Sequence, residues 1–189
     1  MLNISRNLKW LRKRLTWNYK YAIGKWNFME QESKRYATIV NFIKETKIVN
    51  PSILDLGCGY GSLYNYLNEN EISNYLGVDL SDTAIYKARK NKHIKSSFVV
   101  GDIQKFETIE KFDIIIFNEV LYYLDNPFES VIRFDSNFKK EGFYIFSFYG
   151  ERNDLKEMLA ARYELIKNEV VIKEINKNWG INLFKINNK

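Results

Sequence analysis

The sequence feature that most constrains the fold is ILDLGCGYG, residues 53–61, in which three glycines follow an apolar run. The apolar run predicts a strand, and Gly57, Gly59 and Gly61 then form the turn that leaves it. Glycine costs chain entropy on folding, so it is favoured where the backbone takes a positive φ or lets a ligand come close. In doubly wound sheets, ligands bind at this first strand-to-helix loop. The spacing G-x-G-x-G differs by one residue from the loop of dinucleotide-binding proteins.

The rest of the chain repeats the alternation of strand and helix. Short apolar stretches predict strands at 52–56, 75–79, 97–100, 112–117, 143–149, 165–173 and 179–186. Helical periodicity predicts helices near 61–69, 82–91, 127–139 and 153–161. We therefore expect an α/β fold with a doubly wound, mostly parallel seven-stranded sheet of Rossmann-like type. The last two strands have no helix between them, which predicts an antiparallel hairpin at one edge, and helices before the first strand are expected to cover the sheet.

Length and composition predict a single domain. The 189 residues are 46% hydrophobic, enough for one core over 1–189, with an N-terminal helical lid at 1–50 and a binding core at 51–189. No apolar run approaches the roughly 20 residues of a membrane span, and the N-terminal region lacks the apolar stretch of a signal peptide. One cysteine, Cys58, and one histidine, His93, give no internal disulfide and no ordinary zinc cluster. These features predict a cytoplasmic protein with no membrane partner and no metal.

The net charge of +6 is concentrated near the N-terminus. Residues 1–30 contain seven of the 29 basic residues and one of the 23 acidic residues, so the remainder of the chain is neutral. Leu8, Leu11 and Leu15 recur there at helical spacing with basic residues between them. This pattern favours an amphipathic cover helix with a solvated basic face. The alternative is an arm that binds nucleic acid through phosphate contacts and stacking.

Three aspartates follow apolar strands at consecutive strand-to-helix loops. They are Asp55, Asp79 and Asp102. Asp79 ends the second strand, where a carboxylate can accept hydrogen bonds from both hydroxyls of a ribose. Each aspartate alone is compatible with an ordinary loop cap. Their recurrence at three successive loops favours a nucleoside-binding site.

The combination of D-x-G-C-G-x-G after the first strand, G-V-D at the second and G-D at the third resembles the class I S-adenosylmethionine (SAM) dependent methyltransferases. The resemblance covers about residues 50–150 and implies SAM as cofactor, S-adenosylhomocysteine as product and no metal. It implies that Gly57 and Gly59 let the backbone pass under the methionine part of the cofactor. It also implies that Asp55 lies near the cofactor's ammonium group and that the Asn118 carbonyl accepts from it.

The resemblance assigns the nucleoside part of the cofactor to the second and third strands. It implies that Asp79 holds the ribose hydroxyls and that Leu80 packs against the adenine. Asp102 would accept from the adenine amino group, and the backbone of Ile103 would face the ring. An adenosine-linked amino acid, and not a phosphate, is then the ligand that approaches the glycine loop.

The stretch NEVLYYL after the fourth strand contains the candidate catalytic groups. It lacks the Asn/Asp-Pro-Pro-aromatic motif of many nucleobase amine methyltransferases. Glu119 and Tyr123 stand where many small-molecule members have histidines, so they are the candidates to assist a hydroxyl or ammonium acceptor. Packing and cofactor contact are the alternative roles for both. The stretch is also similar to that of nodulation-type N-methyltransferases, which act on amino sugars.

Aromatic residues of the N-terminal segment and of two later loops are candidates for the acceptor pocket, although core packing is expected for about half of them. They are Trp17, Tyr19, Tyr21, Trp26, Tyr122, Tyr123 and Tyr149. We expect SAM-dependent methyl transfer to an O or N atom of a small polar acceptor, anionic or sugar-linked if the basic segment faces it. The alternatives are an RNA methyltransferase that uses the basic segment, and a SAM-binding module without activity.

Overall fold

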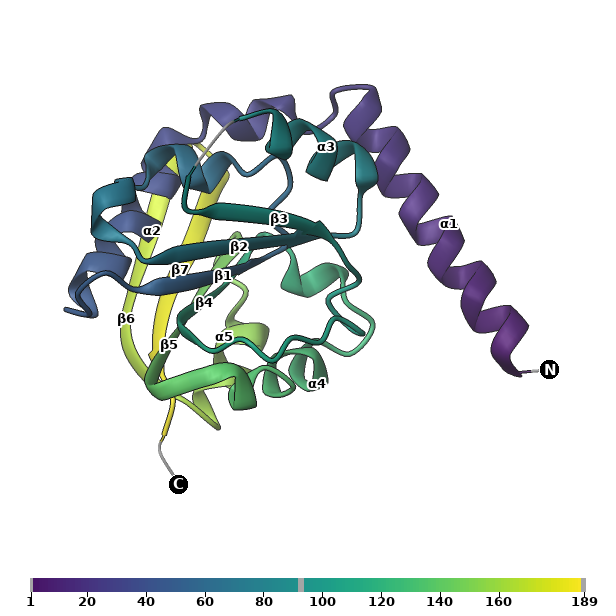
Figure 1. Ribbon diagram of the computed structural model, residues 1–189. Coiled ribbons are helices and arrows are strands. Elements are labelled where there is room, and N and C mark those ends of the chain that lie inside the picture. The colour runs from purple at the N-terminus through teal and green to yellow at the C-terminus, as the bar shows by residue number, and fades with distance from the viewer. Residues whose placement is uncertain (1, 92–93, 188–189) are drawn as a thin grey trace.

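The computed structural model describes residues 2–91 and 94–187, so His93 lies outside the described residues. Its centre is one sheet in the order β3-β2-β1-β4-β5-β7-β6 (Figure 1). The strands are β1 (Ser52–Leu56), β2 (Asn74–Asp79), β3 (Ser96–Val100), β4 (Phe112–Asn118), β5 (Phe138–Tyr149), β6 (Glu164–Glu174) and β7 (Lys177–Lys185). The first five pair in parallel, whereas β7 runs antiparallel to both β5 and β6. The predicted fold class, including the antiparallel edge hairpin, is confirmed.

Helices cover both faces of this sheet. Four of them, α2 (Ser33–Glu45), α3 (Asp82–Lys90), α4 (Pro127–Ile132) and α5 (Asn153–Ala160), flank the sheet, whereas α1 (Leu2–Ala22) packs beside α3. One apolar core lies between the sheet and α2 with α3, and a second lies between the sheet and α4 with α5. Within the described ranges, no helix is long and apolar enough to cross a membrane.

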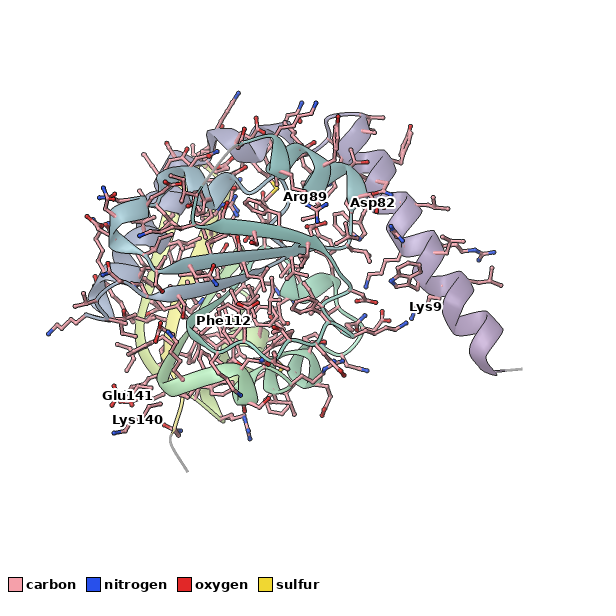
Figure 2. All side chains as sticks on the ribbon, in the orientation of Figure 1. Lys9, Asp82, Arg89, Phe112, Lys140 and Glu141 are labelled. Atoms are coloured by element: carbon pink, nitrogen blue, oxygen red, sulfur yellow. The ribbon has the colours of Figure 1, made fainter. Side chains whose placement is uncertain are left out.

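The central strands are apolar on both faces because both faces are covered. Ile114, Ile115 and Ile116 of β4 are all fully buried, and they alternate between the two cores. Figure 2 shows Phe112 inside the molecule, whereas Lys140 and Glu141 of β5 lie on its surface. Since β1 pairs in parallel register with both β2 and β4, the carboxyl ends of these three strands meet at one edge.

One predicted α-helix is absent from the structure, and another is much shorter. The segment 61–69 forms two 3₁₀ turns, η2 (Ser62–Tyr66) and η3 (Glu69–Glu71), because Gly61 is left-handed and Asn68 caps a new turn through the Asn70 N–H. The segment 127–139 is helical only in α4, followed by the 3₁₀ turn η5 (Asp135–Asn137).

Strand β5 accordingly begins five residues before the predicted strand at 143–149. Phe138 pairs with Phe112 in the sheet, and its ring lies 4.7 Å from that of Tyr144. Sheet pairing and aromatic packing at Phe138 therefore override the helical pattern that precedes it.

Helix α1 has the opposite orientation to the one its sequence pattern predicted. Leu8, Leu11 and Leu15 are exposed, and three of the basic residues bond to the body of the protein. Arg14 donates to Asp82 of α3, and Lys13 donates to the Tyr123 carbonyl at 2.9 Å. Figure 2 shows Lys9 on the inner side of α1, where its ammonium donates to Asp125 at 2.9 Å. The hydrogen-bond acceptors on the body determine the orientation of α1. The prediction of a solvated basic face was wrong.

Candidate functional site

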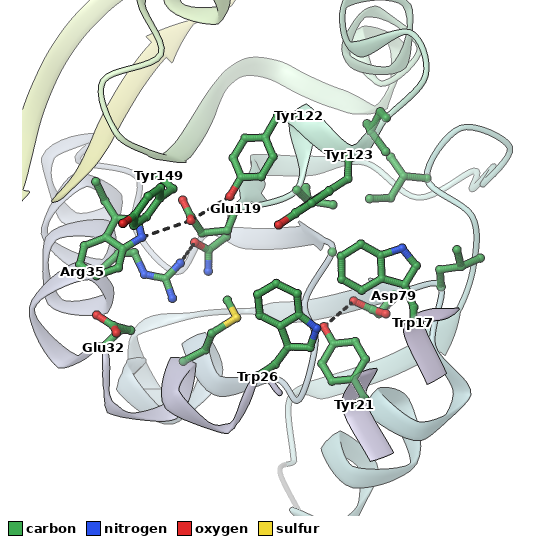
Figure 3. Close-up of a pocket in the computed structure, with 18 of the residues that line it drawn as sticks. Trp17, Tyr21, Trp26, Glu32, Arg35, Asp79, Glu119, Tyr122, Tyr123 and Tyr149 are labelled. Carbon is green, nitrogen blue, oxygen red and sulfur yellow. Dashed lines mark hydrogen bonds between the residues drawn. The ribbon is translucent and has the colours of Figure 1, made fainter. Parts of the chain in front are cut away.

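A cavity of about 630 Å³ opens at the carboxyl ends of β1, β2 and β4. Figure 3 shows Asp79 and Tyr21 at one end of it and Glu32 and Tyr149 at the other. Predicted site residues that line it are Trp17, Tyr21, Trp26, Gly57, Asp79, Leu80, Asp102, Ile103, Asn118, Glu119, Tyr122, Tyr123 and Tyr149. Asp55 and Gly59 are not among the lining residues, and the exposed Tyr19 is not either. The strand order thus brings most of the predicted site together.

Asp79 forms an anionic acceptor at one end of the cavity. Its carboxylate accepts from the backbone N–H of Ser81 at 2.8 Å and of Gly59 at 3.0 Å, with the Tyr21 hydroxyl at 3.5 Å. Burial raises the pKa of Asp79 to about 6, although these three donors act in the opposite direction. A buried carboxylate fixed by two backbone donors is well suited to bind a vicinal diol.

Gly57 and Gly59 have the backbone that only glycine adopts readily. Their φ angles are +83° and +55°, and the N–H of Gly57 donates to the Val78 carbonyl at 2.7 Å. A Cβ atom at Gly57 would lie 2.7 Å from the Val120 side chain, on the floor of the cavity. The glycine loop therefore keeps this part of the cavity open.

Asp55 lies behind the glycine loop and is fully buried. One carboxylate oxygen accepts from the Tyr75 hydroxyl, and the other has no partner in the part of the chain that the structure describes. Burial raises the pKa of Asp55 to about 7, against the effect of the Tyr75 hydrogen bond. Its orphaned oxygen marks a place where the loop lacks a donor.

The slot beyond Asp79 is lined by Leu80, Asp102 and Ile103. Ile103 is buried, and one oxygen of Asp102 accepts from the backbone N–H of Gln104 at 3.1 Å. An apolar wall next to a carboxylate matches a planar heteroaromatic ring with an exocyclic amino group.

Arg35 of α2 is a site residue that the sequence analysis missed. Its buried guanidinium donates to the Asn118 side-chain carbonyl at 2.8 Å and lies over the rings of Tyr36 and Trp179. Across residues 2–91 and 94–187, no carboxylate is within ion-pair distance of Arg35, and its Nε–H has no partner. A buried cation with no carboxylate in direct contact is unfavourable, so this arrangement fits an anionic ligand group.

A signal for Arg35 was present in the sequence. It precedes Ile39 by four residues and Phe42 by seven, so it occupies the apolar face of α2. A charged residue at a buried position of a helix calls for a partner. The identity of that partner depended on how α2 packs, which the pattern does not give.

Glu119 is fixed at the centre of the cavity. Its backbone is left-handed, with φ +58°, which is uncommon for a residue other than glycine. One oxygen accepts from the Ser147 hydroxyl at 2.8 Å; the other accepts from the Tyr122 hydroxyl at 2.9 Å and from Trp179 Nε1 at 3.1 Å. Burial raises the pKa of Glu119, and the positive charge of the nearby Arg35 acts in the opposite direction. These contacts hold the carboxylate in one orientation.

Aromatic side chains form the wall between the two ends. Tyr123 meets Trp17 edge to face, with centroids 5.0 Å apart, and Trp17 stacks on Trp26 at 5.7 Å. The indole N–H of Trp26 is buried, and none of the described residues accepts from it. The rings make this wall largely apolar.

The far end of the cavity is lined by charged groups that were not predicted. Lys173 of β6 donates to the buried Glu32 at 2.7 Å, while Arg152 and Lys177 lie at the same end. Arg152 also lies over the Tyr122 ring, 5.5 Å from its centroid. These residues come from distant parts of the chain, so no local motif could identify them.

Comparisons with known proteins agree with this geometry. A family profile described as a methyltransferase domain matches residues 49–187. The malonyl-[acyl-carrier protein] O-methyltransferase of Halalkalibacterium halodurans is 35% identical over 127 residues, covering 61% of this chain and 47% of that protein. Nodulation protein S of Bradyrhizobium diazoefficiens is 35% identical over 102 residues, covering 52% of this chain and 47% of that protein. The chain spans about half the length of these curated relatives.

Solved structures give the same fold. The N-methyltransferase NodS from Bradyrhizobium japonicum, crystallised with S-adenosylhomocysteine, has a TM-score of 0.73 at 19% identity and covers 82% of this chain and 87% of its own. The magnesium protoporphyrin IX methyltransferase of Synechocystis, with bound SAM, has a TM-score of 0.68 at 15% identity and covers 84% of this chain and 81% of its own. Because the family profile spans most of the chain, the chain belongs to the methyltransferase-domain family, as its resemblance to the class I SAM-dependent enzymes predicted.

Proposed function

We propose that this protein binds SAM at the Asp79 end of the cavity and transfers its methyl group to an O or N atom of a small polar acceptor at the other end. The observation that carries the proposal is the single cavity that joins Asp79 to the Glu119 cluster. The relative named as an O-methyltransferase and the solved structure named as an N-methyltransferase support transfer to O or N. The single cysteine favours a cytoplasmic location.

The residues present fit this cofactor. Asp79 would accept from the ribose hydroxyls, and the slot at Asp102 and Ile103 would take the adenine. Arg35 would bind the carboxylate of the methionine part, because it is a buried cation without a carboxylate partner in the described chain. Asn118, which already accepts from Arg35, would present its backbone carbonyl to the ammonium group of the cofactor.

When bound, SAM supplies a methyl group on a sulfonium, which is already activated for displacement. The protein then contributes mainly alignment, which lowers barriers by up to about 7–11 kcal/mol in favourable intramolecular reactions. Glu119 would hold the proton of a hydroxyl or ammonium acceptor, since its carboxylate is fixed by Ser147 and Tyr122 and burial raises its pKa. Tyr123 would orient the acceptor from the opposite wall.

An anionic or sugar-linked acceptor is the class that we favour. Arg152, Lys173 and Lys177 line the far end of the cavity, although each also pairs with a carboxylate. A carboxylate or phosphate there would exchange with the exposed carboxylates of Asp154 and Glu174 at little cost. Tyr149 and Trp179 offer ring faces on which a sugar would pack.

The second candidate is an RNA methyltransferase, favoured by the basic charge of residues 1–30. Lys9, Lys13 and Arg14 hydrogen-bond to the body of the protein, however, so fewer cations are free to meet phosphates. An RNA substrate would require binding that weakens steeply between 50 and 200 mM salt (about 10³-fold for six phosphate contacts). Methylation of a small acceptor would change far less over that range.

The deciding experiment is incubation of the protein with methyl-labelled SAM and a metabolite extract, followed by mass spectrometry. We expect the label in a small polar product, with none in total RNA at 150 mM salt. Label in RNA alone would favour the second candidate. Calorimetry that shows NAD binding without SAM binding would contradict both.

We also propose that α1 and η1 (Asn27–Gln31) form a lid over the cavity. Trp17, Tyr21 and Trp26 come from this segment and contribute one wall. Deleting residues 1–26 should abolish methyl transfer and weaken SAM binding, while circular dichroism shows that the sheet domain stays folded. Full turnover by the truncated protein would contradict the lid.

A further inference from the structure

The outer face of α1 is a continuous apolar row. The exposed fractions are 50% for Leu8, 44% for Leu11, 57% for Leu15, 65% for Tyr19 and 57% for Ile23, which follows the helix. The spacing of three or four residues puts the helical members on one face. Single exposed leucines are ordinary on protein surfaces, but a row of this length indicates a contact with something apolar. We call these five residues the outer stripe.

The outer stripe points away from the protein because the opposite face of α1 is already occupied. Arg14 Nε and Asn18 Nδ2 both donate to Oδ2 of Asp82, at 2.7 and 3.0 Å. Trp17 packs on Tyr123. Figure 1 shows the N-terminal half of α1 standing clear of the remainder of the fold. One side of this helix is therefore available to a partner, and that side is apolar.

The charge of α1 restricts the partner. Its sequence contains six basic residues and no acidic residue. Arg12 is exposed and lies four residues after Leu8 and three before Leu15, so it borders the outer stripe. A second copy of α1 would bring like charges together. A groove that encloses a helix would need more than the one face that is free.

We propose that α1 docks in the plane of an anionic lipid surface. The leucines of the outer stripe would enter the boundary between headgroups and acyl chains, as in interfacial amphipathic helices. Tyr19 would lie at the headgroup level, where aromatic side chains are favoured. The exposed Arg12 would meet lipid phosphates. This surface is separate from the cavity, so the inference does not depend on the proposed methyl transfer.

The inner face of the same helix contributes Lys13, Trp17 and Tyr21 to the cavity. Lipid binding on one side of α1 and cavity lining on the other would therefore be linked through a single rigid element. A protein held by α1 would keep one wall of its cavity at the lipid surface.

The test is sedimentation of the full-length protein with vesicles of phosphatidylcholine, alone or mixed equally with phosphatidylglycerol. We expect at least tenfold tighter partitioning to the anionic vesicles at 50 mM salt. The double variant Leu11→Gln/Leu15→Gln should partition to the anionic vesicles at least tenfold more weakly than the wild type. The matched double variant Ile109→Gln/Ile175→Gln removes two apolar side chains that are 95% and 91% exposed elsewhere, and should bind as the wild type does.

A second pair of variants tests the contribution of positive charge. Arg12→Gln should weaken partitioning about fivefold, the effect of one cation near an anionic surface, whereas Lys34→Gln on the exposed side of α2 should not. Equal partitioning by the wild type and the double leucine variant would overturn the proposal. So would a concentration-dependent dimer that the leucine variant dissociates, because a second copy would then cover the stripe. Binding to a purified acidic carrier protein, without vesicle binding, would assign the stripe to a protein partner instead.

Discussion

The two N-terminal helices both precede the first strand, yet they are attached to the protein by different forces. Helix α2 buries Ile39 and Phe42 completely against the sheet. Helix α1 is held by hydrogen bonds and ion pairs, such as those of Lys9 and Arg14, together with the aromatic packing of Trp17, and leaves its leucines exposed. Apolar burial contributes far more to stability than exposed ion pairs do. Helix α2 is therefore part of the architecture, whereas moving α1 should cost less than moving α2.

Each of these helices supplies a group to the cavity, at opposite ends of the expected cofactor. Helix α2 brings Arg35 to Asn118, where the methionine part would lie. Helix α1 brings the Tyr21 hydroxyl to Asp79, where the ribose would lie. The contact from the fixed helix is short, at 2.8 Å, and the contact from the movable helix is long, at 3.5 Å. We infer that one end of the site is preorganised and that the other is adjustable.

The largest expected effect is a difference in the free energy of unfolding between a variant in α2 and a variant in α1. Phe42→Ala leaves a cavity in the core and should lower the free energy of unfolding by about 3–5 kcal/mol. Leu15→Ala, on the exposed face of α1, should change it by less than about 0.5 kcal/mol. Urea denaturation followed by circular dichroism measures both. A large loss for Leu15→Ala would mean that the outer face of α1 is covered in solution.

The next effect tests Arg35 as a ligand of the cofactor carboxylate. Arg35→Met should weaken S-adenosylhomocysteine binding about ten- to hundredfold, because a charge-assisted hydrogen bond contributes about 1.5–3 kcal/mol. Methylthioadenosine, which lacks the amino-acid part, should bind the variant and the wild type equally. Calorimetry with both ligands makes the comparison. Equal losses for both ligands would show that Arg35 acts through the fold instead.

The difference between these helices also explains what the sequence could predict. Asp79 and Gly57 could be found because the strand order itself brings successive strand ends together. The partner of Arg35 could not, because it depends on how α2 packs on β6 and β7. For α1, the periodicity of Leu8 and Leu11 identified two faces correctly, but it did not say which face meets the protein. The contacts of α1 with Asp82 and its neighbours, which are distant in the sequence, determine which face is turned inward.

A third prediction concerns pH at the adjustable end. Asp79 has a pKa of about 6, raised by burial from its usual range. The ionised form accepts from ribose hydroxyls, so affinity should be constant above pH 7. Below pH 6, protonation competes with binding, and the dissociation constant for S-adenosylhomocysteine should rise about tenfold per pH unit.

The control for this profile is Asp79→Asn, which should bind more weakly and lose the step near pH 6. A step that persists near pH 7 in this variant would belong to Asp55, whose pKa is about 7. A wild-type profile that is flat between pH 5 and 7 would contradict the role of Asp79.

The smallest effect concerns the hydroxyl of Tyr21. It donates to the same Asp79 oxygen that accepts from the Gly59 N–H, and a bound ribose would have to replace it. Because the bond is long, giving it up should cost only about 0.5 kcal/mol. Tyr21→Phe keeps the ring in the wall of the cavity and removes the competing donor, so S-adenosylhomocysteine should bind about twofold more tightly at pH 8. Tyr21→Ala also removes the ring and should bind more weakly than the wild type. Weaker binding by Tyr21→Phe would instead mean that the hydroxyl stays in contact with the ligand, and α1 would then belong to the preorganised part of the site.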